Sequence, residues 1–186
     1  MVNDRRPAVF LDRDGVLNEA IVVDCRPQPP RSLAEFRLEA GVENACRRLH
    51  QAGLVLVVVS NQPDLARGTI KREAVNEVNA ALRGALALDA IYICPHDDAD
   101  ACECRKPAPG MLLAAARELR LDLTHSVMVG DRWRDVEAGR RAGTATVFLE
   151  KGYQEPAPAS ADLVVSALPE AVDWIVGRLR PHTIRE

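Results

Sequence analysis

Short, wholly apolar runs alternate with segments of helical periodicity along most of the chain. Buried strands are expected at 8–11, 54–59, 90–94, 126–129, 144–149 and 162–165, because these runs are apolar on both faces. Helices are expected at 41–52, 71–86, 109–120, 134–142 and 168–179, where apolar residues recur every three to four positions. Strands that alternate with helices build a parallel sheet covered on both faces. The pattern therefore predicts an α/β fold, a Rossmann-like doubly wound parallel sheet of five to six strands.

Two stretches lack either periodicity. Residues 16–40 contain prolines at 27, 29 and 30, which indicates an irregular flap and loop, and residues 151–161 form a Pro/Ala-rich loop. Neither the first stretch nor any other interval offers the roughly 40 residues that an independently folding unit needs. We therefore expect one domain over residues 1–186, without a separate cap domain.

Composition excludes several classes of function. The chain is 47% hydrophobic with a formal net charge of -3, and it contains neither a polybasic patch nor an apolar run approaching membrane-spanning length. These features predict no nucleic-acid partner and no membrane partner. An odd number of cysteines and the absence of a recognisable signal peptide indicate a cytoplasmic protein. A monomer acting on a small molecule is the simplest expectation.

Polar residues follow the predicted strands at four places. Asp12 and Asp14 follow the first strand, Ser60 the second and Asp131 the fourth, while Lys106 lies in the loop after the third. Each alone has an ordinary explanation, since Asp and Ser are common turn and capping residues and Lys is usually solvated. Ligands of doubly wound sheets, however, bind beyond the carboxyl ends of the strands. Together these residues therefore predict one polar site.

The residue types at these strand ends suit phosphoryl transfer. Crowded carboxylates need a cation, and oxygen ligands with open water positions suit Mg²⁺. A lysine and a hydroxyl beside that ion can hold a phosphoryl group. One carboxylate can attack phosphorus, and a second, two residues on, can exchange protons with the leaving alcohol and with water.

A second motif follows the third predicted strand. Cys94, His96, Cys102 and Cys104 form C-x-H, five residues, C-x-C, which is typical of a closed structural Zn²⁺ site. Two buried cysteines beside a surface histidine are one alternative. A disulfide is another, disfavoured because an i, i+2 pair closes poorly. The loop ends in Arg105 and Lys106, so the metal would stiffen a segment that presents two cations.

These motifs together resemble the haloacid-dehalogenase-like phosphohydrolases. The resemblance rests on D-R-D-G-V-L-N at 12–18, V-S-N-Q at 59–62, C-R-K-P at 104–107 and G-D-R-W-R-D at 130–135. It implies Asp12 as the nucleophile and Asp14 as the general acid/base, with Ser60 and Lys106 holding the phosphoryl group. Magnesium ligands implied by the resemblance are Asp12, the Asp14 carbonyl and Asp131, and Asp135 would support that site.

Within this family the zinc loop is similar to that of the heptose bisphosphate 7-phosphatases and of the related histidinol phosphatases. The segments 61–68 and 106–111 favour the heptose branch, although the five-residue spacing between His96 and Cys102 matches the histidinol type. A phosphorylated sugar is the implied substrate. The resemblance implies that it contacts Ala20, Ile21, Val22, Val23, Asn61, Gln62, Pro63, Arg67, Arg105 and Arg132. For the arginines, the alternative is a solvated surface position.

Two functions of other classes remain open at this point. A phospho-accepting signalling domain also pairs a strand-end Asp with a Lys, but Asp14 would discharge its acyl phosphate quickly, so the lifetime of the phosphorylated protein separates the two. The other is a zinc-stabilised interaction module with an inactive site. Mg²⁺-dependent release of phosphate from a simple ester would exclude that module.

Overall fold

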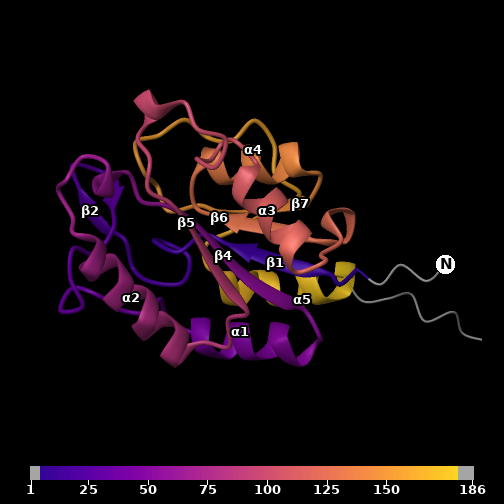
Figure 1. The fold of residues 1–186 in the computed structure, drawn as a ribbon. Helices are drawn as coiled ribbons and strands as arrows, with labels where there is room; N and C mark the ends of the chain where they lie inside the picture. Colours follow the sequence, from indigo (N-terminus) through magenta and orange to yellow (C-terminus); the bar gives the residue numbers. More distant parts are fainter. Residues whose placement is uncertain (1–4, 180–186) are drawn as a thin grey trace, which may run out of the picture.

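A six-stranded parallel sheet forms the centre of residues 5–179, the part of the chain that the computed structural model describes (Figure 1). Its strands are β1 (Ala8–Leu11), β4 (Val55–Asn61), β5 (Ala90–Cys94), β6 (Val127–Gly130), β7 (Ala145–Leu149) and β8 (Leu163–Val165). They lie in the order β5-β4-β1-β6-β7-β8, and every adjacent pair is parallel. After β1, the chain first adds β4 and β5 on one side of that strand and then β6, β7 and β8 on the other side. The expected doubly wound α/β fold is confirmed.

Helices cover both faces of this sheet. Helices α1 (Val42–Gln51), α2 (Arg72–Ala85) and α5 (Leu168–Leu179) lie on one side, and α3 (Gly110–Glu118) and α4 (Trp133–Ala142) lie on the other (Figure 1). In β1, Val9 and Leu11 enter the first of these two cores, while Phe10 enters the second. Alternate side chains of a strand point to opposite faces, so two covered faces require the wholly apolar runs seen in the sequence.

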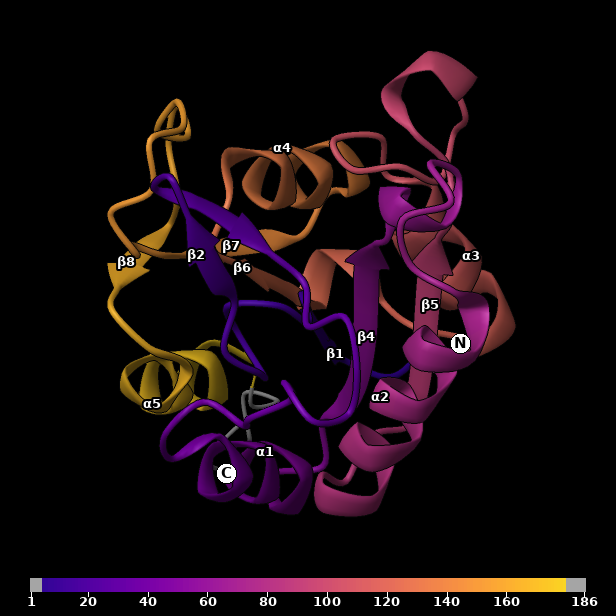
Figure 2. The same ribbon diagram turned by 90° about the vertical axis from the view of Figure 1, so that its left-hand side faces the viewer.

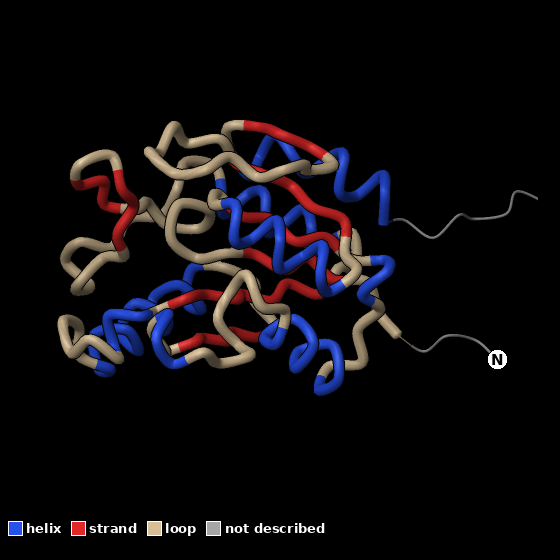
Figure 3. The backbone as a smooth tube through the Cα atoms, turned by 90° about the horizontal axis from the view of Figure 1, so that it is seen from above, coloured by secondary structure: helices blue, strands red, loops and turns tan. Residues whose placement is uncertain are grey.

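The segment after β1 is a β-hairpin, whereas the sequence predicted irregular structure there. Strands β2 (Ile21–Val23) and β3 (Arg26–Gln28) pair antiparallel and stand apart from the main sheet (Figure 3). Asp24 and Cys25 form the turn, with φ angles of 49° and 57°. Positive φ at both positions matches the twist that a two-residue hairpin needs. Pro27 is tolerated because both strands of a two-stranded ribbon are edges.

The other elements begin or end within one or two residues of their predicted limits, which is the usual uncertainty of such boundaries. The main difference is β4, which continues through Ser60 and Asn61 instead of ending at 59. Both residues are in register with β5, where Ser60 lies opposite Ile93 and Asn61 opposite Cys94. No further domain is inserted among residues 5–179. None of the helices in this range has the length and apolar character that crossing a bilayer requires.

Candidate active site and metal centres

β1 lies between β4 and β6 in the sheet, so the carboxyl ends of these three parallel strands lie side by side. The order in which the chain adds strands reverses at β1. Asp12 follows β1 directly and donates its N–H to the carbonyl of Val129 in β6, at 2.9 Å. Ser60 lies at the corresponding end of β4, and Asp131 follows β6. The topology thus brings together side chains that are far apart in the sequence.

Lys106 lies at the middle of this group, with only 1% of its surface exposed. Its Nζ donates to Asp12 Oδ1 at 2.8 Å, to Asp135 Oδ1 at 2.6 Å and to the Val59 carbonyl at 2.7 Å. Burial alone would lower the pKa of Lys106, but the two carboxylates outweigh it and raise the pKa above its ordinary value. The ammonium is therefore charged and held in place.

The carboxylates around Lys106 fit a divalent cation. One oxygen each from Asp12, Asp131 and Asp135 lies within 4.8 Å of the others. Burial raises the pKa of Asp12 to about 6, despite the lowering effect of Lys106. Burial, together with the charges of Asp12 and Asp135, raises the pKa of Asp131 well above its ordinary value. The carboxylates repel one another when ionised, and a bound cation would relieve this repulsion. Mg²⁺ prefers oxygen ligands of this kind.

Asp131 and Asp135 differ in how their oxygens are used. Asp135 accepts hydrogen bonds from Lys106 and from the backbone N–H of Arg132, at 3.0 Å. Neither buried oxygen of Asp131 has a hydrogen-bond partner of good geometry among the described residues, although the nearby Tyr153 hydroxyl opposes the effect of burial, which raises the pKa of this carboxyl. A Cβ placed on Gly15, whose φ is +87°, would meet Asp131 Oδ2 at 1.9 Å, so the backbone of the 14–15 segment approaches this carboxylate closely. These observations fit Asp131 as a metal ligand and Asp135 as a supporting group.

Asp14 is held by four hydrogen bonds. Arg13 donates through Nε to Oδ1 at 3.1 Å and through Nη2 to Oδ2 at 3.0 Å. Asn18 and Gln62 donate at 3.0 and 2.8 Å. Arg13, for which the sequence predicted no role, is fully buried and also donates to Asn79 in α2. The sequence pointed to Arg13 only through its position between the two strand-end carboxylates.

A cavity of about 340 Å³ opens over these residues. Of the predicted substrate contacts, Asn61, Pro63, Arg67, Arg105 and Arg132 line it. Gln62 and residues 20–23 are absent from its lining. Gln62 is fully buried and donates to Ser60 Oγ at 2.9 Å, so its side chain is held in the interior, next to Ser60. The second strand of the hairpin lines the cavity instead, together with Pro29 and Arg31 of the segment that follows it.

Asn61 also fixes the loop that carries Lys106. Its side-chain oxygen accepts from the Lys106 N–H, and its side-chain nitrogen donates to the Lys106 carbonyl, both at 3.0 Å. This two-way contact joins the end of β4 to the loop after β5. Glu155, from the Pro/Ala-rich loop, forms an ion pair with Arg132 that the sequence did not predict.

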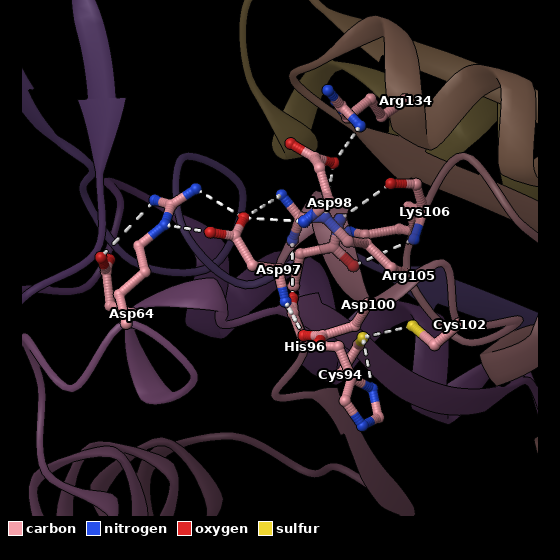
Figure 4. A network of polar contacts seen from close by, with 12 residues as sticks. Asp64, Cys94, His96, Asp97, Asp98, Asp100, Cys102, Arg105, Lys106 and Arg134 are labelled. Atoms are coloured by element: carbon pink, nitrogen blue, oxygen red, sulfur yellow. Dashed lines mark hydrogen bonds and ion pairs between the residues drawn. The ribbon is translucent and has the colours of Figure 1, made fainter.

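The predicted zinc ligands form one cluster, part of which is drawn in Figure 4. Cys94 Sγ lies 3.6 Å from both His96 Nδ1 and Cys102 Sγ, and Cys104 Sγ lies 3.1–3.4 Å from the other three ligand atoms. A zinc tetrahedron with Zn–S bonds of about 2.3 Å has edges near 3.8 Å. The cluster therefore has the size and donor set of a Zn²⁺ site filled by protein ligands. The three sulfur atoms of the cluster lie 3.1 Å or more from one another, which does not fit the disulfide alternative.

The fold and this site together define a class of enzyme, and comparison with known proteins agrees. The HAD-hydrolase-like family model matches residues 103–175. A relative from Yersinia pestis is 37% identical over 94% of this chain and 97% of its own length. The chain belongs to the HAD-like hydrolase family.

The relatives have more particular names. The Yersinia pestis protein is a D-glycero-beta-D-manno-heptose-1,7-bisphosphate 7-phosphatase. An Escherichia coli K12 protein of the same name is 35% identical, covering 97% of this chain and 94% of the relative. A D,D-heptose 1,7-bisphosphate phosphatase from B. bronchiseptica, solved with magnesium and phosphate, superimposes with a TM-score of 0.79 at 32% identity, covering 92% of this chain and 98% of that chain.

Proposed function

We propose that this protein is a Mg²⁺-dependent phosphomonoesterase that removes the 7-phosphate of D-glycero-D-manno-heptose 1,7-bisphosphate. The observation that carries the proposal is the meeting of Asp12, Lys106 and Asp131 in one buried group beside a cavity. The shared name of relatives that match nearly the whole chain supports the choice of sugar.

In the first step Asp12 attacks the phosphorus of the ester. A bond forms between a carboxylate oxygen and phosphorus, the bond from phosphorus to the sugar oxygen breaks, and Asp14 donates a proton to that oxygen. Lys106 and the Ser60 hydroxyl balance the charge on the phosphoryl oxygens. Arg13 and Gln62 fix the direction of Asp14, which must reach the leaving oxygen.

In the second step Asp14 takes a proton from water, and the water oxygen attacks phosphorus. The bond from phosphorus to Asp12 breaks, which releases inorganic phosphate and restores the free carboxylate. A nearby acid/base of this kind shortens the life of the acyl phosphate. It therefore favours an enzyme over a phospho-accepting signalling domain.

Two metals complete the proposal. Asp12, Asp131 and the Asp14 carbonyl would hold Mg²⁺, which supplies charge stabilisation to the phosphoryl oxygens when bound. Cys94, His96, Cys102 and Cys104 would hold a structural Zn²⁺, because four protein ligands leave no position for substrate. The proposal also includes a monomer, and the exposed thiol of Cys25 supports a reducing, cytoplasmic location.

Phosphate release from several esters tests the substrate. We expect kcat/KM for one anomer of heptose 1,7-bisphosphate to exceed that for histidinol phosphate and fructose 1,6-bisphosphate by about tenfold or more, roughly 1.4 kcal/mol of transition-state discrimination. Each ester is compared with and without Mg²⁺. A preference for histidinol phosphate would favour the second branch of the family and overturn the heptose assignment.

Replacing Asp14 by Asn is expected to lower kcat by about 10²- to 10⁴-fold, the usual contribution of a general acid/base. Both steps lose their proton carrier, so the rates of phosphoenzyme formation and breakdown fall together. Rapid-quench measurement of phosphoenzyme separates the two rates. Slowing of one step alone would show that a different group serves the other step.

A further inference from the structure

A backbone hydrogen bond fixes the tip of the hairpin β2–β3 next to the cavity. The Cys25 carbonyl, at its turn, accepts a hydrogen bond from the N–H of Gln154 at 3.0 Å. Gln154 belongs to the loop between β7 and β8, and the hairpin tip lies near that loop in Figure 2. This contact therefore restricts the backbone position of Arg26, the next residue after the turn.

The hairpin and the segment directly after it bring two arginines to the cavity that contains Asp12 and Lys106. Arg26 and Arg31 both line it, and prolines between them restrict the backbone. The cavity volume of about 340 Å³ is many times the roughly 10–15 Å³ that a single water molecule needs by this kind of measure. One phosphoryl group at Asp12 would leave most of this space for the rest of a substrate.

Arginines on the other walls of the cavity are already paired with carboxylates of the chain. The pairs are Arg67 with Asp97 and Asp64, Arg105 with Asp98 and Asp97, Arg134 with Asp98, and Arg132 with Glu155. Figure 4 shows how Asp97 and Asp98 of the zinc loop lie among these cations. The contact from Arg67 to Asp97 is bidentate, with both distances at 2.7 Å. These walls therefore offer little uncompensated positive charge.

Arg26 and Arg31 differ from the other cavity arginines. Within residues 5–179 neither has a carboxylate oxygen within the 4.0 Å of an ion pair, and the Arg31 guanidinium donates only to the neutral amide oxygen of Gln28, at 3.1 Å. Both side chains are exposed to solvent. Two guanidinium groups without a carboxylate partner suit a phosphate dianion, which accepts paired N–H donors.

We propose that Arg26 and Arg31 form a subsite for a second phosphate group of the substrate, the one that is not transferred to Asp12. The inference rests on the proposed phosphatase function and adds the residues that select a bisphosphate over a monophosphate. It also places this selectivity on the hairpin, away from the paired arginines of the zinc loop.

Calorimetric titration of the Asp12→Asn variant with Mg²⁺ tests the subsite without turnover. The ligands are heptose 1,7-bisphosphate and heptose 7-phosphate, which differ only in the second phosphate. We expect the bisphosphate to bind about 10- to 100-fold more tightly, as charge-assisted hydrogen bonds allow. Adding Arg26→Gln and Arg31→Gln should reduce this ratio to about threefold or less, chiefly by weakening bisphosphate binding.

The matched control carries Arg47→Gln and Arg83→Gln, two exposed positions on α1 and α2 that remove the same net charge away from the cavity. This control should keep the bisphosphate preference. Equal affinities for both ligands in the Asp12→Asn variant would overturn the subsite, as would an unchanged ratio after the two hairpin substitutions. Failure of the unsubstituted protein to release phosphate from any ester would instead overturn the proposed function, whatever the ratio of affinities.

Discussion

The Asp12→Asn variant is expected to release no measurable phosphate, with a loss of kcat on the order of 10⁴-fold or more, as for other removed nucleophiles. The amide is a far weaker nucleophile than the carboxylate, so the covalent step fails. The fold should survive, because the Asn oxygen can still accept from Lys106 Nζ and from the N–H of Arg13. Removing one of three crowded buried carboxylates should leave the melting temperature equal or higher.

Phosphate release and thermal unfolding of this variant are measured beside those of Asp173→Asn. Asp173 lies on α5 with its side chain 87% exposed, so that control should behave as the parent protein in both assays. Residual activity of Asp12→Asn above a few per cent of the parent value would remove the covalent mechanism.

Loss of the zinc cluster is expected to have the second large effect. The Cys102→Ala variant should purify without stoichiometric zinc and unfold about 6–12 °C lower, equivalent to about 3 kcal/mol for a chain of this size. Its kcat should also fall, by about 100-fold, because Lys106 follows the ligand Cys104 by two residues and loses its fixed direction. Metal analysis, thermal unfolding and phosphate release check the three parts.

Cys25→Ala is the matched control, because it removes a free thiol that is exposed and lies outside the cluster. It should keep its zinc and its activity. A Cys102→Ala protein with the parent melting temperature and full activity would contradict a structural role for the metal.

The parallel sheet could be predicted because both of its faces are covered, which demands uninterrupted apolar runs such as Leu54 to Val59. The meeting of Asp12, Ser60 and Asp131 followed from the same topology, since each lies at the carboxyl end of a parallel strand. Zinc-ligand spacing is local in sequence, and the structure brings those four ligand atoms together. The chemical roles of these side chains remain predictions.

Other features depend mainly on tertiary contacts, which the sequence pattern does not reveal. The hairpin depends on positive φ at Asp24 and Cys25, in a stretch whose prolines indicate loop. The burial of Arg13 depends on contacts with Asn79 and Asp14, which only the packing of α2 supplies. Gln62 was assigned to the substrate from the family resemblance, and in the structure its side chain donates to Asp14 and to Ser60. Each of these outcomes was decided by tertiary contacts instead of pattern.

The join between the hairpin tip and the loop after β7 uses only main-chain atoms, the Cys25 oxygen and the Gln154 nitrogen. Position 154 can therefore keep this contact with any residue except proline, which has no N–H to give, whereas the positive φ at position 25 limits the residues that fit there. The tip of the hairpin is therefore held beside the neighbouring loop by a contact that does not depend on the chemistry of either side chain.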